Sequence, residues 1–194
     1  MADVYFYIKK DELNDSLKYG IKLSKNYNGQ TVINNINKKY IQGLLNPKDD
    51  LEKFNSTEFC CIRATISNDY LFVCDKNLLN SDYFSENIIS IANYKFGYYR
   101  TPIILIVCSL LPEQLNTINK IIDVPVLYNS SQELYLENAI ESLKLDINSC
   151  NEIILNSLLE NLGKKGILSK VYLDNNTFLY KDSNGKIYTS KTNI

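Results

Sequence analysis

The chain has 194 residues, with 21 basic and 22 acidic side chains and no histidine. This length fits one domain, or a domain with a small appendage, and it is sufficient to bury a core. The absence of histidine excludes Ser-His and Cys-His nucleophiles and the commonest general base, and it argues against a zinc site. With 45% hydrophobic and 22% charged residues, the chain is expected to fold as a globular protein.

Neither a signal peptide nor a membrane span is predicted. The longest apolar run, residues 103–111, is far shorter than the roughly 18–20 residues that cross a bilayer. The chain has five cysteines, an odd number, and four of them lie in apolar stretches. This pattern indicates free thiols in a reducing compartment rather than a disulfide framework. We therefore expect a cytoplasmic protein with no membrane partner.

The amino-terminal region predicts a strand followed by a helix. Residues 4–8 are β-branched and aromatic, as in a buried strand. Asp11 is expected to cap a helix that carries Leu13 and Leu17 on one face, and Gly20 is expected to end it in a left-handed conformation. Residues 31–45 have weaker patterning, which indicates a mixture of strand and loop.

The middle of the chain predicts alternating strands and helices. Asp49 or Asp50 is expected to cap a short helix through residue 54. Strands are expected at 59–66 and 70–74. In the first of these, Arg63 lies on the face opposite the apolar side chains of Cys60, Ile62, Ala64 and Ile66.

Three further elements are expected before residue 129. A helix that opens at Ser81 or Asp82 would carry Phe84, Ile88 and Ile91 on one stripe. The most hydrophobic strand, 103–108, is apolar on both faces and is therefore expected at the centre of the sheet. Pro112 is expected to begin another helix, and a short strand follows at 124–128.

The carboxy-terminal third predicts two helices and a β-meander. The helices begin at Ser130 and Ser149, each with a capping-box pattern, and the second ends at Gly163. The strands are expected at 168–173, 177–181 and 186–190. The predicted fold class is α+β: a mixed central sheet with flanking helices, then two helices and a C-terminal antiparallel β-meander. We divide the chain into a core, 1–129, and a segment packed on it, 130–194.

One segment has the composition of a ligand site. Residues 94–102 contain four aromatic side chains, two cations and a glycine, and they precede the central strand. Aromatic faces together with Arg100 could stack on a base and hold a phosphate. Alternatively, the tyrosines cover the edge of the sheet and Arg100 pairs with an acid.

The other charged clusters permit two interpretations each. Asp49, Asp50 and Glu52 could bind a divalent cation, but helix capping explains them without a metal, and no metal site is predicted. The lysine-rich residues 164–191 could contact nucleic-acid phosphates. The alternative for this segment is a solvated surface, because it contains no arginine for reading bases.

Three stretches resemble the ADP-ribosyltransferase-like fold, especially DNA-targeting ADP-ribosyltransferases and RNA 2′-phosphotransferases. They are residues 4–8 with the apolar helix up to Ile21, residues 98–106, and residues 110–118. The resemblance implies that the family's first-strand histidine, which contacts nicotinamide dinucleotide, falls on Phe6. The glutamate that orients the ribose falls on Ile103, which cannot stabilise oxocarbenium-like charge. The core is therefore expected to be catalytically degenerate.

These observations lead to three functional expectations. The first is a binding or interaction protein that keeps a nucleotide-sized cleft, with NAD as the cofactor that the resemblance implies. The second is an active NAD-dependent ADP-ribosyltransferase acting on protein or nucleic acid, with Glu86 or Glu113 as its catalytic acid. The third is a DNA-binding protein that uses a winged-helix-like segment, 130–194. The residues expected to line the cleft are Tyr5, Tyr7, Tyr98, Tyr99 and Arg100.

Overall fold

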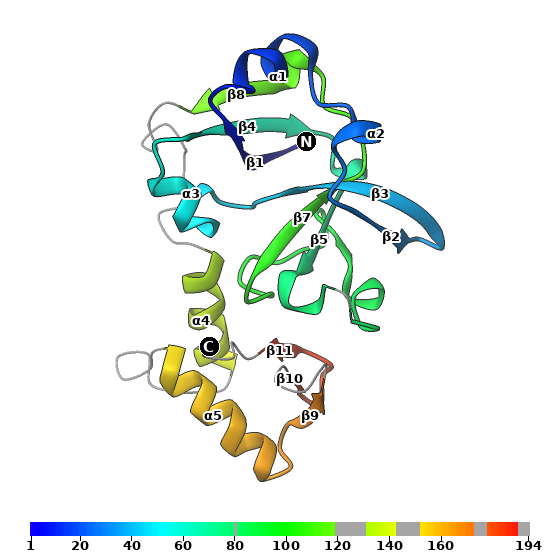
Figure 1. Cartoon of the computed structure of the whole chain (residues 1–194). Helices are drawn as coiled ribbons and strands as arrows, with labels where there is room; N and C mark the ends of the chain where they lie inside the picture. The colour runs from blue at the N-terminus through cyan, green and yellow to red at the C-terminus, as the bar shows by residue number, and fades with distance from the viewer. Residues whose placement is uncertain (80, 119–130, 143–151, 173–177, 190–194) are drawn as a thin grey trace.

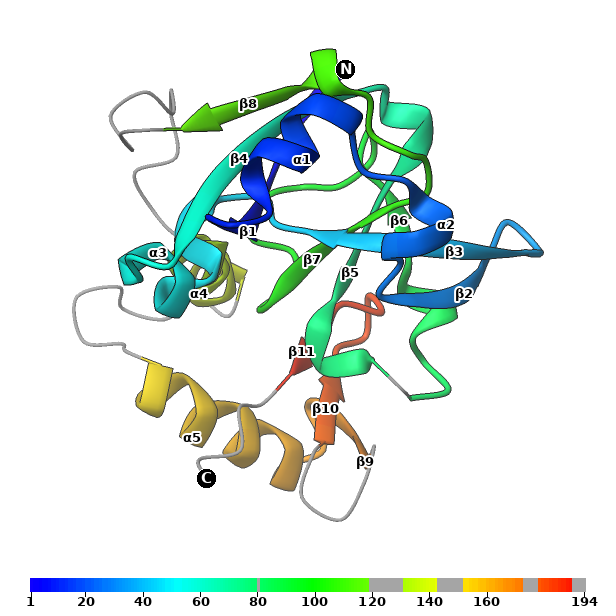
Figure 2. The same cartoon turned by 45° about the horizontal axis from the view of Figure 1, so that its top comes forward.

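The computed structural model describes residues 1–79, 81–118, 131–142, 152–172 and 178–189, and its fold is α+β, as predicted. Two antiparallel sheets form the amino-terminal part (Figure 1). A third antiparallel sheet and two helices form the carboxy-terminal part. Figure 2 shows the same three groups of elements from a second direction.

The first sheet has the strand order β1-β4-β8. Its alternation matches the prediction, since Ile62, Ala64 and Ile66 are fully buried and Arg63 lies on the opposite face. On that face a guanidinium nitrogen of Arg63 lies 4.0 Å from a carboxylate oxygen of Asp3. The strands are β1 (Ala2–Lys9), β4 (Phe59–Ile66) and β8 (Leu115–Ile118).

The second sheet has five strands in the order β2-β3-β7-β5-β6. All five residues of β7 are buried, which confirms that the most hydrophobic strand is central. A strand covered on both faces needs apolar side chains at every position, so continuous hydrophobicity rather than alternation is its signature. The strands are β2 (Gly29–Ile33), β3 (Ile36–Gly43), β5 (Leu71–Asp75), β6 (Ile89–Ser90) and β7 (Pro102–Ile106).

The two sheets face each other across one hydrophobic core. Phe6 and Ile62 from the first sheet belong to the same buried cluster as Ile104 and Ile106 from the second. Full burial of such side chains stabilises the fold by about 1.5–3 kcal/mol each. The sheets also meet through the backbone of Tyr5, which exchanges hydrogen bonds of 3.0 and 2.7 Å with Leu44 just beyond β3.

The helices of this part are short. They are α1 (Leu13–Tyr19), α2 (Leu23–Asn26) and α3 (Leu51–Asn55), with 3-10 turns at Pro47–Asp49, Asn68–Tyr70, Lys76–Leu78, Ser85–Asn87 and Pro112–Gln114. Gly20 ends α1 with a φ of 71°, as predicted. The predicted cap at Asp11 is wrong, because Glu12 occupies the N-cap position and makes no side-chain cap bond.

Two predicted helices are wrong. The apolar stripe of Phe84, Ile88 and Ile91 belongs to a single 3-10 turn followed by β6, whose Ile89 pairs with Val73 at the edge of the sheet. Pro112 likewise begins only a 3-10 turn, and the chain then enters β8. In both places, pairing with an existing strand satisfies the backbone groups of a short segment better than an isolated helical turn does.

The carboxy-terminal part contains α4 (Ser131–Ser142), α5 (Glu152–Lys164) and the antiparallel meander β9 (Ser169–Tyr172), β10 (Phe178–Lys181) and β11 (Ile187–Thr189). The predicted helices and meander are confirmed. The predicted strand at 124–128 and the caps at Ser130 and Ser149 lie outside the described residues. Leu179 and Ile187 of the meander pack with Phe72 and Leu105 on the second face of the five-stranded sheet.

The structure gives two further facts on the chemistry of the chain. The cysteines that it describes, Cys60, Cys61, Cys74 and Cys108, are free thiols. Among the described helices, none combines the length and the hydrophobicity that a membrane-spanning segment needs.

Candidate functional site

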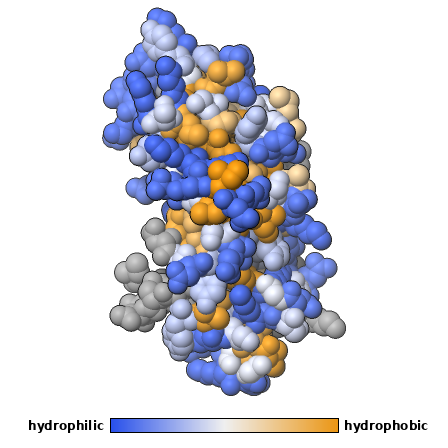
Figure 3. Space-filling view, turned by 90° about the vertical axis from the view of Figure 1, so that its right-hand side faces the viewer, coloured by the Kyte–Doolittle hydropathy of each residue, from blue (hydrophilic) through white to orange (hydrophobic). Residues whose placement is uncertain are grey.

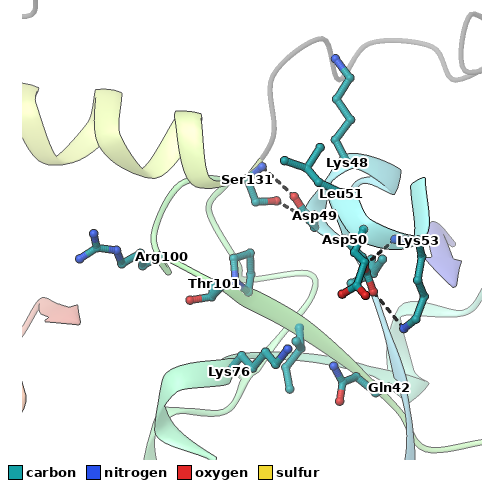
Figure 4. Close-up of a pocket in the computed structure, with 14 residues that line it drawn as sticks. Gln42, Lys48, Asp49, Asp50, Leu51, Lys53, Lys76, Arg100, Thr101 and Ser131 are labelled. Carbon is teal, nitrogen blue, oxygen red and sulfur yellow. Dashed lines mark hydrogen bonds and ion pairs between the residues drawn. The ribbon is translucent and has the colours of Figure 1, made fainter. Parts of the chain in front are cut away.

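Two adjoining cavities form a groove beside the end of β3. The larger has a volume of about 490 Å³ and reaches from α3 to the ends of β5 and β7 and to the first residue of α4 (Figure 4). The smaller has a volume of about 270 Å³ and lies against β1 and β3. We call their union the β3 groove, because both cavities are lined by Gln42, Leu44, Asp50 and Lys53.

A run of capping residues shapes one wall of the β3 groove. The Asn46 side chain accepts a hydrogen bond from Lys48 N at 2.9 Å, and the Asp49 carboxylate accepts one from Asn46 N at 3.0 Å. Asp50 then accepts from Lys53 N at 3.1 Å and begins α3. The predicted cap is thereby confirmed at Asp50. These reciprocal bonds hold the charged side chains of this turn at fixed positions along the groove.

Asp49 also connects this wall to the carboxy-terminal part. One of its carboxylate oxygens accepts from Ser131 N at 2.9 Å and the other accepts from Ser131 Oγ at 2.8 Å. Burial raises the pKa of Asp49, and the hydrogen bonds from Ser131 and Asn46 oppose that rise. The carboxylate thus ties the first turn of α4 to the groove, where helix N–H groups lack partners within the helix.

The groove carries charges of both signs. Lys48, Lys53 and Lys76 line the larger cavity together with Asp49, Asp50 and Glu52. Lys53 Nζ lies 3.0 Å from Asp50 Oδ2. Desolvation acts to raise the pKa of Asp50, but the hydrogen bonds from Lys53 and the charges of Lys53 and Lys76 outweigh it, and the pKa is lowered.

These groups suit recognition of a polar ligand with an anionic part. Ammonium groups bind phosphate or carboxylate oxygens, and carboxylates accept hydrogen bonds from hydroxyl groups. Leu44, Leu51 and Pro102 add apolar surface to the lining. Within the part of the chain that the structure describes, no three cysteine, aspartate or glutamate side chains gather as metal ligands.

Two of the residues predicted to bind a ligand reach the groove. Tyr7 lines the smaller cavity and donates its hydroxyl to the Pro47 carbonyl at 2.7 Å, and burial raises its pKa. Arg100 lines the larger cavity, but its guanidinium points away from Asp50 and Lys53 (Figure 4). Its Nη1 donates to Asn156 Oδ1 at 2.8 Å and to the Thr189 carbonyl, so Arg100 joins the segment just before β7 to α5 and β11.

The other predicted tyrosines lie in the packed interior beside the groove. Tyr5 and Tyr99 are 4% and 2% exposed. Tyr99 stacks on Tyr94 with ring centroids 5.6 Å apart, and half-buried Tyr98 meets Tyr99 edge-on at 5.1 Å. The segment 94–102 therefore covers the sheet with its rings, and neither cavity is lined by Tyr5, Tyr98 or Tyr99.

The positions singled out by the family resemblance both lie on the groove. Phe6 lines the smaller cavity and Ile103 lines the larger one. Glu86 and Glu113, in contrast, are exposed and line neither cavity. The acidic residues on the groove are instead the capping residues Asp49 and Asp50, together with Glu52 of α3.

The lysines of the carboxy-terminal segment contact groups of the protein itself. Lys164 pairs with Glu160 at 3.0 Å, and Lys186 Nζ donates to Ser142 Oγ at 2.9 Å. Burial lowers the pKa of Lys186. The Lys181 ammonium lies 5.4 Å from the ring centroid of Tyr83. These contacts favour the interpretation of this segment as an ordinary protein surface over its interpretation as a nucleic-acid interface.

The sequence did not indicate that Lys48, Lys53, Lys76 and Ser131 would line one cavity. The dense acidic cluster at 49–52 was the available signal, but it predicted capping and no cavity. Comparison of the chain with family models, with curated proteins and with solved structures finds no match. The geometry of the β3 groove is therefore the basis for a functional proposal.

Proposed function

We propose that this protein binds an anionic ligand of nucleotide size in the β3 groove and does not transform it. We also propose that the core, residues 1–129, is similar to the ADP-ribosyltransferase fold. One observation carries it: Phe6 and Ile103, the positions that correspond to the family's histidine and glutamate, line the two adjoining cavities. Residues far apart in the sequence thus line adjoining cavities, which supports the proposal.

The dimensions and charges of the groove support such a ligand. Its larger cavity, about 490 Å³, lies within the range of about 300–1,000 Å³ found for small-molecule sites. Lys53 lines both cavities, so its ammonium is placed to meet a phosphate that extends from one to the other. Gln42 and Asp50 also line both cavities and offer hydrogen-bonding groups for sugar hydroxyls.

The absence of catalysis in this proposal rests on the same two positions. Neither phenylalanine nor isoleucine can accept a proton or stabilise the positive charge that develops on the sugar carbon as nicotinamide departs. Glu86 and Glu113 lie outside the groove and are too exposed to act there. Free thiols at four described cysteines support the further proposal that the protein works in a reducing, cytoplasmic compartment.

Isothermal titration calorimetry with NAD and with ADP-ribose tests this proposal. We expect binding that becomes about tenfold weaker in the double variant Lys53→Gln/Lys76→Gln, because it loses charge-assisted hydrogen bonds to phosphate. Lys164→Gln/Lys165→Gln is the matched control, since it removes the same charge and these lysines line neither cavity. Absence of heat with both ligands would contradict the proposal.

Chemical analysis of the same mixtures tests the absence of catalysis. We expect NAD to remain intact after prolonged incubation, with no release of nicotinamide by mass spectrometry. Release that depends on Asp49, Asp50 or Glu52 would instead support the alternative of an active transferase. In that case, the acidic residues of the groove would take the role that Ile103 cannot perform.

A further inference from the structure

Strand β2 leaves one edge of the five-stranded sheet open. It pairs with β3 in the register that places Ile33 opposite Ile36. The two-residue turn between them consists of Asn34 and Asn35, with φ values of 52° and 63°. This is the geometry of a tight hairpin whose flanking residues are hydrogen-bonded to each other.

The register determines which backbone groups face outward. Because hydrogen-bonded and non-hydrogen-bonded pairs alternate in an antiparallel ladder, Gln30 and Val32 turn their N–H and C=O groups away from β3. Within the described residues, no backbone hydrogen bond outside the β2–β3 ladder involves these groups. An open edge of this kind is a template for another strand.

Exposed lysines lie on the elements next to this edge. Residues 16–48 contain six lysines and no acidic residue, although the whole chain has a net charge of −1. Lys22 and Lys25 lie on or next to α2, which packs against β3, and Lys39 lies on β3 itself. All three are exposed. Glu86 lies on the 3-10 turn Ser85–Asn87, which contacts β2, and adds an acidic side chain there.

Apolar side chains accompany the lysines. Val32 and Ile36 are 48% and 59% exposed, and Tyr27 is 45% exposed beside the Lys39 ammonium, which lies 4.0 Å from its ring centroid. Figure 3 shows the side from which the hairpin projects, where hydrophobic residues are interspersed among hydrophilic ones. The exposed aliphatic groups and the alternating N–H and C=O groups of the open edge suit a polypeptide strand, whereas a phosphodiester chain has no N–H donors for the carbonyl groups and no side chains to cover the aliphatic ones. The surface also lacks arginine, the side chain that nucleic-acid recognition favours.

We propose that the open edge of β2 binds an extended acidic segment of a partner protein, which adds to the sheet as its next strand. The partner's backbone pairs with Gln30 and Val32. Its acidic side chains meet Lys22, Lys25 and Lys39, and its apolar side chains cover Val32. This interaction surface is distinct from the β3 groove and does not depend on the function proposed for the groove.

The test uses the full chain and a fluorescein-labelled octapeptide of alternating valine and glutamate. We expect a rise in fluorescence anisotropy at low salt and weaker binding as salt increases. The triple variant Lys22→Gln/Lys25→Gln/Lys39→Gln should bind about tenfold more weakly, from three exposed charge pairs. The control Lys10→Gln/Lys164→Gln/Lys165→Gln changes the net charge equally and should bind like the wild type.

A second variant separates strand addition from charge attraction. Gln30→Pro removes one outward N–H, a position at which an edge strand tolerates proline, and should weaken binding about fivefold. Circular dichroism establishes that each variant is folded. Lack of peptide binding at low salt, equal loss in the control triple variant, or unchanged affinity in Gln30→Pro would overturn the proposal. Tighter binding of oligothymidine or of phosphatidylserine vesicles would overturn it in favour of those partners.

Discussion

Replacement of Asp49 by alanine removes a single carboxylate that three backbone and side-chain donors share. Ser131 N, Ser131 Oγ and Asn46 N all donate to it, at 2.8–3.0 Å. Both donor residues are almost completely buried, with 3% of Ser131 and 2% of Asn46 exposed. Because Asp49 lines the groove, water replaces only part of the lost acceptor, and the buried donors of Ser131 and Asn46 keep the substitution costly.

The expected destabilisation follows from these contacts. Loss of a helix cap costs about 0.5–2 kcal/mol, and each buried donor left without a partner costs about 1–3 kcal/mol. The desolvation of the carboxylate, which raises its pKa, offsets part of this cost. We expect Asp49→Ala to lower the free energy of unfolding by about 2–3 kcal/mol, equivalent to a fall in Tm of about 4–12 °C for a chain of this size.

Urea denaturation followed by circular dichroism measures this effect, with Asp50→Ala as the matched control. Asp50 lines the same groove but caps only the short α3 and pairs with a partly exposed lysine, so its loss should cost about 1 kcal/mol. We also expect faster proteolysis within α4 in Asp49→Ala alone. An Asp49→Ala variant within about 0.5 kcal/mol of the wild type would refute the role of Asp49 as the anchor of α4.

The pH dependence gives an independent check. Because the pKa of Asp49 is raised in the folded protein, the folded state holds this proton to higher pH than the unfolded chain does. The stabilisation that this proton provides is fully present below pH 3.8, the ordinary pKa of an aspartate. It is lost as the pH rises through the raised pKa of Asp49 in the folded protein. The difference in unfolding free energy between wild type and Asp49→Ala should therefore be larger in acid than at neutral pH. A difference that grows with pH would contradict this reasoning.

Two further predictions test other parts of the fold. Gly20→Ala should lower the free energy of unfolding by about 2–3 kcal/mol, because a Cβ at this position would overlap the Leu110 carbonyl oxygen. Gly166→Ala is the control: Gly166 has the same φ of 71° but open space around it, so its substitution should cost only about 1 kcal/mol in the same urea titrations. The buried carboxylate of Asp75 accepts hydrogen bonds from Asn77 N, Arg100 N and Thr189 Oγ1. Asp75→Asn should therefore lower the free energy of unfolding by about 2–4 kcal/mol and accelerate amide hydrogen exchange in β11. Unchanged exchange in β11 would show that Asp75 does not hold this strand.

The strands were more predictable than the helices for a physical reason. In β4, half-buried and buried residues alternate over the six positions 61–66, and the expected and observed bounds of the strand coincide at Phe59–Ile66. The stripe of Phe84, Ile88 and Ile91 has equally regular helical spacing, but the segment around it is short. Its backbone pairs with β5 instead, a partner that is close only in the folded chain.

The candidate site was predictable only in part. Tyr7 and Arg100 both line the groove, yet the Arg100 guanidinium is directed to α5 and β11, so its composition-based role as a phosphate ligand has no support from its geometry. A run of aromatic and cationic residues indicates packing as readily as binding. The direction of the Arg100 side chain depends on contacts with segments more than fifty residues away.

The sequence by itself determined the α+β class, the central position of β7, the inward face of β4 and the closing meander, because each depends on local spacing or on continuous hydrophobicity. It also placed charge unevenly along the chain, with no acidic residue between 16 and 48. Only the tertiary structure decided that Phe6 and Ile103 share a groove and that Asp49 anchors α4 across it. These arrangements depend on the packing of one sheet on another, which no pattern within a single segment encodes.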